Sequence, residues 1–469
     1  MRTTIQAFIL ALFILSSVRF AHAQATVGYK MPSYEKFKLP NGLTVYLMEK
    51  HTVPVMSIRV IMPAGAIDNG DKAGLAYLTS SCLTTGTKHY TKSQIDEQVD
   101  FMGAILNAYS GTENSVVTAK FAVKDRDKML PIVQDILLNA TFPDTEFVKI
   151  KKQELSSIEQ AKESPASVIR DYWKKFIYGN HLYGNVVKGT TASLSALTTD
   201  DVKAFYKNYY SPAGAAIAVV GDFNNKEMKG TITSLFSNWK GSPLSAKASV
   251  EPVTDTLSKT RVLLVNKDDA KETTFLIGAM GITRSNPDYL AVQVVNTVFG
   301  GRFTSLLNEE LRVKTGLTYG AFSSFDYFKD AGTFYINTHT ANATTKAAID
   351  TALAVLNHLH IMPLDATTLT SAKNYMIGLF PPQYQTTDQL AYLLTDMFWY
   401  GYNESYINNF EANVNAVTLG KANEIISKYF PKDKLQMVLI GKAADIRSIA
   451  ASYGPVLERE IKDDIEKGL

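Results

Sequence analysis

The chain has 469 residues, of which 46% are hydrophobic, and its 48 lysines and arginines nearly balance its 45 aspartates and glutamates. The formal net charge of +3 argues against a nucleic-acid partner, since phosphate binding requires a clustered basic surface. The single cysteine, Cys82, allows no internal disulfide, and we expect it to be buried. Because the length exceeds what one hydrophobic core usually serves, two or more domains are expected.

Residues 1–23 have the pattern of an export signal. Arg2 precedes a short apolar run at residues 5–18, and Ala-His-Ala at residues 21–23 is a small-x-small cleavage pattern. The apolar run is shorter than the ~20 residues that span a bilayer, and no later segment is long and apolar enough. We therefore expect an exported, periplasmic protein that begins at Gln24 and has no membrane span after signal removal.

Both halves of the chain alternate predicted strands and helices. β-branched residues and partial alternation predict strands, and apolar periodicity or capping residues predict helices. In chain order, the first half has a strand at 53–63, helices at 128–138, 144–164 and from 199, and a strand at 215–221. The second half has a strand at 272–280, helices at 286–299 and 345–359, and a strand at 436–441.

Matching segments recur at a nearly constant offset along the chain. The strands at 53–63 and 272–280 lie about 218 residues apart, and the terminal Gly221 and Gly441 lie 220 apart. We infer an internal duplication with an α+β architecture. Residues 24–240 would form the first domain and 261–469 the second. Residues 241–260, rich in Ser, Thr, Pro and Ala, would form the linker.

Residues 74–87, GLAYLTSSCLTTGT, follow the first predicted strand and a turn at 64–71. This order of strand, turn and G-x-A helix resembles the pitrilysin/insulinase family of zinc peptidases, whose helix carries H-x-x-E-H. The resemblance covers about residues 35–450. It implies two similar α/β domains, each with an antiparallel-rich sheet packed by helices, which together form half of a clamshell.

The resemblance places the family's zinc site at positions that cannot bind zinc. A catalytic zinc needs three nitrogen or oxygen ligands, and a carboxylate to accept a proton from its water. The two family histidines fall on Tyr77 and Ser81, the catalytic glutamate on Ser80, and the third ligand on Ser157. We therefore expect no metal in this chain.

Other residues do not replace the missing ligands. Glu154 and Glu159 flank the third position, but no imidazole accompanies them. The seven histidines never repeat at i,i+4 on one predicted helix, so we interpret them as surface residues. A nucleophilic role for Ser80 or Ser81 lacks a G-x-S-x-G elbow or a nearby base.

The second half retains another family segment. Residues 299–319, FGGRFTSLLNEELRVKTGLTY, resemble the glycine turn, helix and L-R-x-x-x-G-L-x-Y of the family's C-terminal domain. The family's paired arginine and tyrosine fall on Arg312 and Tyr319. A tyrosine hydroxyl can stabilise an oxyanion, and arginine offers several donors to a neighbouring carbonyl. Gly316 would let the helix end and a strand begin, so that both side chains converge on one cleft.

Residues 103–115 resemble the edge strand with which active family members bind the substrate backbone. Asn107 and Ala108 would be the substrate-binding positions, because an exposed edge offers main-chain donors and acceptors. Because we expect no zinc beside this strand, a peptide bound there would not be hydrolysed by this chain. A structural role is therefore the favoured interpretation of this segment.

The resemblance as a whole implies a catalytically incomplete subunit of a zinc peptidase. Its partner would be a homologous subunit that carries the zinc, in a heterodimer or a dimer of heterodimers, and the substrate would be a peptide. Arg312 and Tyr319 would then act in trans. Two alternatives stay open. One is a structural or interaction protein in which the pair only packs, and the other is a peptide-binding protein that acts alone.

Overall fold

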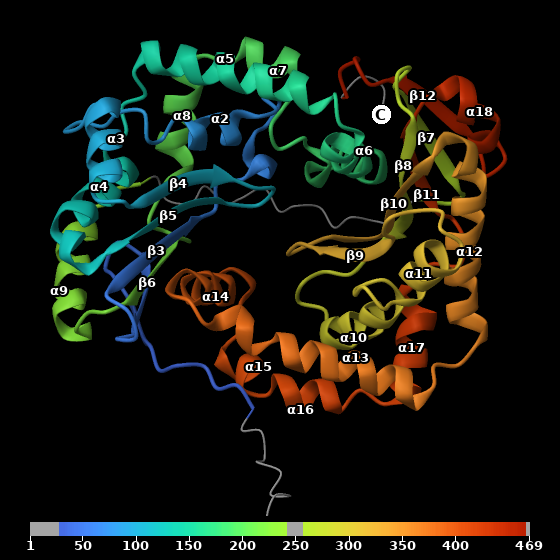
Figure 1. The fold of residues 1–469 in the computed structure, drawn as a ribbon. Helices are drawn as coiled ribbons and strands as arrows, with labels where there is room; N and C mark the ends of the chain where they lie inside the picture. Colours follow the sequence, from blue (N-terminus) through green and yellow to red (C-terminus); the bar gives the residue numbers. More distant parts are fainter. Residues whose placement is uncertain (1–27, 242–256, 466–469) are drawn as a thin grey trace, which may run out of the picture.

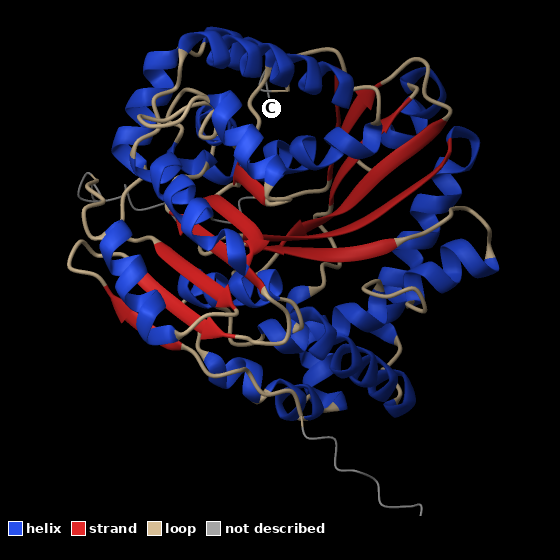
Figure 2. Cartoon of the chain, turned by 60° about the vertical axis from the view of Figure 1, so that its left-hand side comes forward, coloured by secondary structure: helices blue, strands red, loops and turns tan. Residues whose placement is uncertain are grey.

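Two six-stranded sheets, each covered by helices, make up the structure, which is a computed structural model (Figures 1 and 2). It describes residues 28–241 and 257–465. The expected signal at 1–23 and most of the expected linker lie outside the described residues. The first sheet is built from residues before the linker and the second from residues after it.

The first sheet has the strand order β1-β2-β6-β3-β5-β4. The pair β2 and β6 is parallel, and the other neighbouring pairs are antiparallel. Its strands are β1 (Glu35–Lys38), β2 (Thr44–Glu49), β3 (Val55–Met62), β4 (Ile105–Ser110), β5 (Ser115–Ala122) and β6 (Ala216–Gly221).

The second sheet repeats this arrangement in the order β12-β7-β11-β8-β10-β9. The outer strand is the exception, because β12 runs parallel to β7 whereas β1 runs antiparallel to β2. Its strands are β7 (Arg261–Asn266), β8 (Glu272–Met280), β9 (Phe322–Tyr327), β10 (Gly332–Ala341), β11 (Gln436–Gly441) and β12 (Val456–Glu460). The predicted duplicated α+β fold with antiparallel-rich sheets is confirmed.

The helices also follow a common order in the two halves. The first half contains α2 (Leu75–Ser81), α3 (Lys92–Phe101), α4 (Arg126–Leu138), α5 (Asp144–Ala161), α6 (Pro165–Tyr178), α7 (Thr191–Ala196), α8 (Thr199–Tyr209) and α9 (Asn225–Phe236). The second contains α10 (Tyr289–Phe299), α11 (Leu306–Asn308), the π-helix η4 (Glu309–Lys314), α12 (Thr345–Ile361), α13 (Ala366–Leu379), α14 (Thr387–Tyr400), α15 (Glu404–Asn408), α16 (Phe410–Asn415), α17 (Leu419–Tyr429) and α18 (Ala443–Ala451).

The predicted helices differ from the observed ones mainly at their ends. The helix expected from residue 286 begins at Tyr289, because the Asn286 side chain accepts a hydrogen bond from the Asp288 amide and holds a turn there. The helix expected to reach residue 164 ends at Ala161. Pro165 disfavours helical geometry in the residue before it and instead begins α6 at its first position.

The two halves exchange one helix each. Helix α6 of the first half packs on β8 and β11 of the second sheet, and α14 of the second half packs on β3 and β6 of the first. Trp173 of α6 is fully buried, and its indole donates to the Thr333 hydroxyl at 3.2 Å. Both sheets are therefore covered on two faces, which explains the uninterrupted burial of β6 and β11.

A buried carboxylate joins the halves at the centre of this exchange. Glu113, in the turn between β4 and β5, is only 4% exposed. It accepts hydrogen bonds from the Tyr183 hydroxyl at 2.7 Å, the Lys329 amide at 2.8 Å and the Trp399 indole of α14 at 3.2 Å. Two of these three donors belong to the second half. Buried carboxylates are stable only when their oxygens are satisfied in this way.

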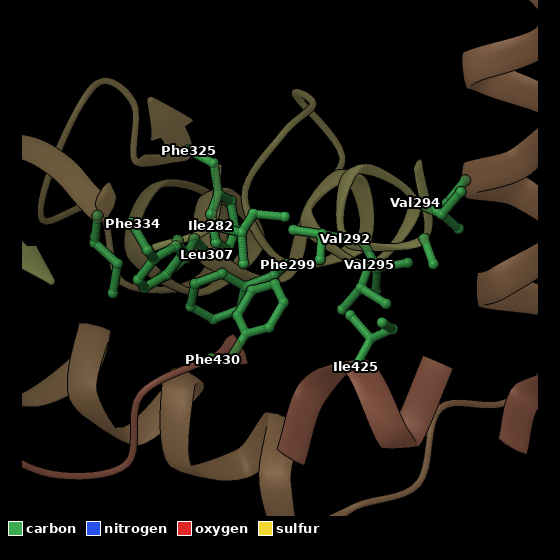
Figure 3. Close-up of a cluster of buried hydrophobic side chains, with 14 of the residues drawn as sticks. Ile282, Val292, Val294, Val295, Phe299, Leu307, Phe325, Phe334, Ile425 and Phe430 are labelled. Carbon is green, nitrogen blue, oxygen red and sulfur yellow. The ribbon is translucent and has the colours of Figure 1, made fainter. Parts of the chain in front are cut away.

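Aromatic rings and aliphatic side chains together fill the core between the second sheet and its outer helices (Figure 3). Phe299 of α10, Phe334 of β10 and Phe430 after α17 lie with ring centroids 5.2–6.0 Å apart. This core fixes the position of α10 and of the segment that follows it. Within residues 28–241 and 257–465, no single helix has the length and apolar character needed to cross a membrane. The bent pair Asn342–Ile361 and Ala366–Tyr384 meets that test only together.

We expect the substitution Glu113→Gln to lower the free energy of unfolding by about 1.5–3 kcal/mol, because glutamine turns an amide donor toward one of the three donors. Thermal unfolding by calorimetry would measure the change. The control is Glu424→Gln, which alters an exposed pair with Lys421. A Glu113→Gln protein that unfolds at the same temperature as this control would contradict the assigned role.

Candidate functional site

Helix α2 occupies the place of the expected zinc helix and keeps a specialised start. Gly74 precedes it in the left-handed region, with φ of 85°. A side chain there would meet a methyl group of Leu194 and the Lys188 carbonyl oxygen. The Ala76 amide donates to Asn69 Oδ1 at 2.8 Å, which supports the first turn. The helix is therefore tightly packed at its start even though it carries no metal ligand.

Tyr77 and Glu154 connect α2 to α5. The Tyr77 hydroxyl donates to Glu154 Oε2 at 2.9 Å, and Lys188 lies over the Tyr77 ring. Burial, and then the hydrogen bond to Glu154, raise the pKa of Tyr77 above its ordinary value. The tyrosine thus remains a neutral donor, and the two residues form a structural contact where the family has a zinc ligand.

The three serines at the remaining positions have no catalytic arrangement. Ser80 is buried, and its hydroxyl donates to the Tyr77 carbonyl oxygen at 2.8 Å. Ser81 and Ser157 are half-buried. Glu159 accepts hydrogen bonds from Thr191, at the start of α7, and from Lys162, directly after α5. Among the described residues, no group of three or more His, Cys, Asp or Glu side chains is arranged to hold a metal ion.

Cys82 directly follows α2 and is fully buried, as expected. Burial, and then the charge of Glu154, raise its thiol pKa to about 12. A thiolate is the reactive form of cysteine, so this residue is inert at neutral pH.

Arg312 and Tyr319 both reach solvent in the second half. Tyr319 is 82% exposed, and Arg312, on the π-helix η4, is also exposed. The Arg312 guanidinium lies 4.6 Å from the centre of the Phe303 ring. Within the described residues, neither side chain has a hydrogen bond or an ion pair. π-helical turns occur frequently at functional sites.

The backbone that carries Tyr319 is held firmly although its side chain is free. Gly316 adopts a φ of 64°, and the chain then turns back, so that the Leu317 amide donates to the Leu311 carbonyl oxygen at 2.8 Å. On β10, the Thr340 hydroxyl donates to the Leu317 carbonyl oxygen at 2.7 Å and the Thr338 hydroxyl to that of Gly320 at 2.9 Å. Strand β9 begins soon afterwards, as the sequence predicts for this segment.

Apolar side chains around this pair are exposed as well. Phe303, Val313 and Phe322 are between 45% and 59% exposed. Large apolar side chains that gather in one exposed segment are typical of a surface that contacts another molecule.

Strand β4 lies at the edge of the first sheet, as the sequence predicts. In the described part of the chain it pairs on one side only, with β5. Ala108 packs toward the core, whereas Asn107 is exposed and lines a cavity of about 420 Å³ with Arg59 and Tyr392. The sequence did not reveal this cavity, because Tyr392 comes from the exchanged helix α14.

Comparisons with known proteins match this chain to one peptidase family. Residues 44–191 match the model of the insulinase family, peptidase family M16, and residues 196–376 match that of the peptidase M16 inactive domain. An uncharacterized zinc protease of Rickettsia felis is 27% identical over 65% of this chain and 73% of its own. Another, from Bacillus subtilis, is 23% identical over 85% of this chain and 96% of its own.

Two solved structures share the fold. A peptidase M16 inactive domain from Pseudomonas fluorescens superposes with a TM-score of 0.81 at 24% identity, over 91% of this chain and 99% of its own. A protease from Helicobacter pylori superposes with a TM-score of 0.78 at 20% identity, over 88% of this chain and 100% of its own.

The contact between α2 and α5 gives a stability prediction. Tyr77→Phe leaves the partly buried Glu154 carboxylate without its tyrosine donor, so we expect a loss of about 1–2 kcal/mol in the free energy of unfolding. Urea unfolding would measure it. Tyr34→Phe is the control, because its hydroxyl bonds to Glu404 at the surface, where water replaces the lost donor. Equal, negligible effects of the two substitutions would show that the α2–α5 contact is not structural.

Proposed function

Because the chain belongs to peptidase family M16, we propose that it is the non-catalytic subunit of an exported, heteromeric zinc peptidase. One observation supports this most strongly. Arg312 and Tyr319 are exposed and unpaired among the described residues, on a backbone anchored by Thr338 and Thr340. Residues kept only for packing would be buried. A rigid backbone that presents free donors is the usual design of a site that stabilises a reaction intermediate.

In this proposal the chain contributes donors and the partner contributes the metal. Peptide hydrolysis places negative charge on the scissile carbonyl oxygen. The Tyr319 hydroxyl would donate a hydrogen bond to that oxygen without adding net charge. The Arg312 guanidinium would hold a neighbouring carbonyl of the substrate through its N–H groups. Zinc in the homologous subunit would activate the attacking water.

The site on α2 supports the same division of labour. The Tyr77–Glu154 contact fills the place of the first zinc ligand, so this chain would hydrolyse no peptide alone. The exposed residues Phe303, Val313 and Phe322 beside the pair would contact the partner or the peptide. Export to the periplasm and assembly as a heterodimer, or a dimer of heterodimers, complete the proposal.

The test is an activity assay of this chain mixed with a zinc-bearing homologue from the same organism. We expect neither protein alone to match the mixture in cleaving a quenched fluorescent peptide. Tyr319→Phe should lower kcat by about 10²–10³-fold, the usual effect of losing one oxyanion donor. Arg312→Gln should mainly raise KM, because it removes a contact to the bound substrate. The control Arg447→Gln alters an exposed pair with Glu458 and should change neither value.

The outcome separates this proposal from its alternatives. Size-exclusion chromatography of each mixture shows whether the complex forms. An intact complex with unchanged kcat after Tyr319→Phe would contradict the catalytic role and favour a structural subunit. A chain that binds peptides but joins no zinc-bearing homologue would favour the peptide-binding alternative.

A further inference from the structure

A cavity of about 550 Å³ in the second half is lined by eight tyrosines, and we call it the tyrosine cavity. The tyrosines are contributed mainly by α10, α14, α15 and the adjacent loops. Two of these lining residues, Tyr375 and Tyr392, are 41% and 51% exposed, so a ligand has access. The volume lies within the range of ordinary ligand sites, about 300–1,000 Å³.

The duplication gives this cavity a counterpart in the first half. A pocket of about 670 Å³ there is lined by Tyr77 of α2, Ser110 of β4, Glu159 of α5 and Asp171 of α6. In the second half the corresponding elements are α10, β9, α13 and α14, and all four line the tyrosine cavity. The tyrosine cavity thus lies at the position in the second half that corresponds to the first-half pocket beside Tyr77.

Arg284 is the cation of the tyrosine cavity. It precedes α10, and its backbone amide is fixed by the Phe328 carbonyl oxygen at 2.9 Å. Its guanidinium carbon lies 3.9 Å from the centre of the Tyr289 ring, and Tyr400, Tyr402 and Tyr406 surround it at 4.7–5.6 Å. Rings placed in this way stabilise a cation, but they do not satisfy its N–H donors.

The one acidic residue of the cavity does not pair with Arg284. Asp396 accepts a hydrogen bond from the Tyr402 hydroxyl at 2.7 Å. Burial raises the pKa of Asp396, against the opposing effects of the Tyr402 hydrogen bond and of the Arg284 charge. In the part of the chain that the structure describes, no carboxylate lies within ion-pair distance of the Arg284 guanidinium. A partly enclosed guanidinium with free donors fits a planar anion that can accept two hydrogen bonds, such as a carboxylate.

The cavity continues toward the edge strand of the first sheet. Tyr392 and Gln383 line both it and the neighbouring cavity that contains Asn107 and Arg59. Arg59 lies over the Tyr392 ring at 4.8 Å and donates to the Tyr109 hydroxyl at 2.6 Å. A ligand seated at Arg284 would therefore have room to extend along β4, as a peptide does and a small acid does not.

We propose that the tyrosine cavity binds the C-terminus of a peptide, with the terminal carboxylate on Arg284 and an apolar or aromatic last side chain among the tyrosine rings. The proposal takes from the proposed function only the expectation of a peptide ligand. It requires neither a partner subunit nor hydrolysis.

The test is isothermal titration of the whole chain, without a partner, with acetyl-Ala-Ala-Leu-Phe as the free acid and as the C-terminal amide. We expect the amide to bind at least roughly tenfold more weakly, the effect of about 1.4 kcal/mol. Arg284→Gln should weaken binding of the acid to the level of the amide and leave binding of the amide unchanged. Arg447→Gln, on the remote helix α18, is the control and should change neither.

Three results would overturn the proposal. The acid and the amide could bind with equal affinity, or neither could bind at millimolar concentration. Alternatively, phenylalanine or acetate could bind as tightly as the tetrapeptide, which would assign the cavity to small acids. If the Arg284→Gln protein does not fold, the difference in affinity between the acid and the amide, measured on the unsubstituted chain, tests the proposal by itself. Because no turnover is measured, failure here is distinct from failure of the Tyr319→Phe test.

Discussion

The exchange of α6 and α14 is the constraint on which the rest of the structure depends. Each sheet would expose one apolar face without the helix donated by the other half. Glu113 fixes the exchange, since its buried carboxylate is satisfied only when Trp399 and the Lys329 amide arrive from the second half. The two halves therefore form one packed unit. Surfaces contributed by both, including the cavity beside β4, exist only in that unit.

The two duplicated halves carry different chemistry on equivalent elements. In the first, α2 and α5 meet through an internal tyrosine–glutamate contact, and the pocket beside them holds no metal cluster among the described residues. In the second, α10 and α14 enclose a tyrosine-walled cavity with an unpaired guanidinium, and η4 presents Arg312. Arg284, Arg312 and Tyr319, whose side chains have no hydrogen bond or ion pair within the described residues, belong to the second half. The proposed role in trans rests on two of these, Arg312 and Tyr319.

Local patterns in the sequence predicted much of the fold. Periodicity located α4, α5, α12 and the paired strands, and the constant offset predicted two similar sheets. The sequence could not predict which sheet α6 and α14 would cover. An apolar helix face shows that the helix packs on something, but not on which surface. The Arg284 cavity and the bonds of Glu113 depend on that exchange and were missed for the same reason. Arg312 and Tyr319 were found by family resemblance, but their exposure and the anchoring by Thr338 and Thr340 needed the structure.

In the proposed assembly, Tyr319 faces the metal site of another chain. The most direct measurement replaces Tyr319 with the photo-crosslinker p-benzoylphenylalanine in the native host and identifies the attached peptide by mass spectrometry. We expect a crosslink to a zinc-bearing homologue, within or next to its H-x-x-E-H helix. Crosslinks only within this chain, or to a partner without that helix, would contradict it.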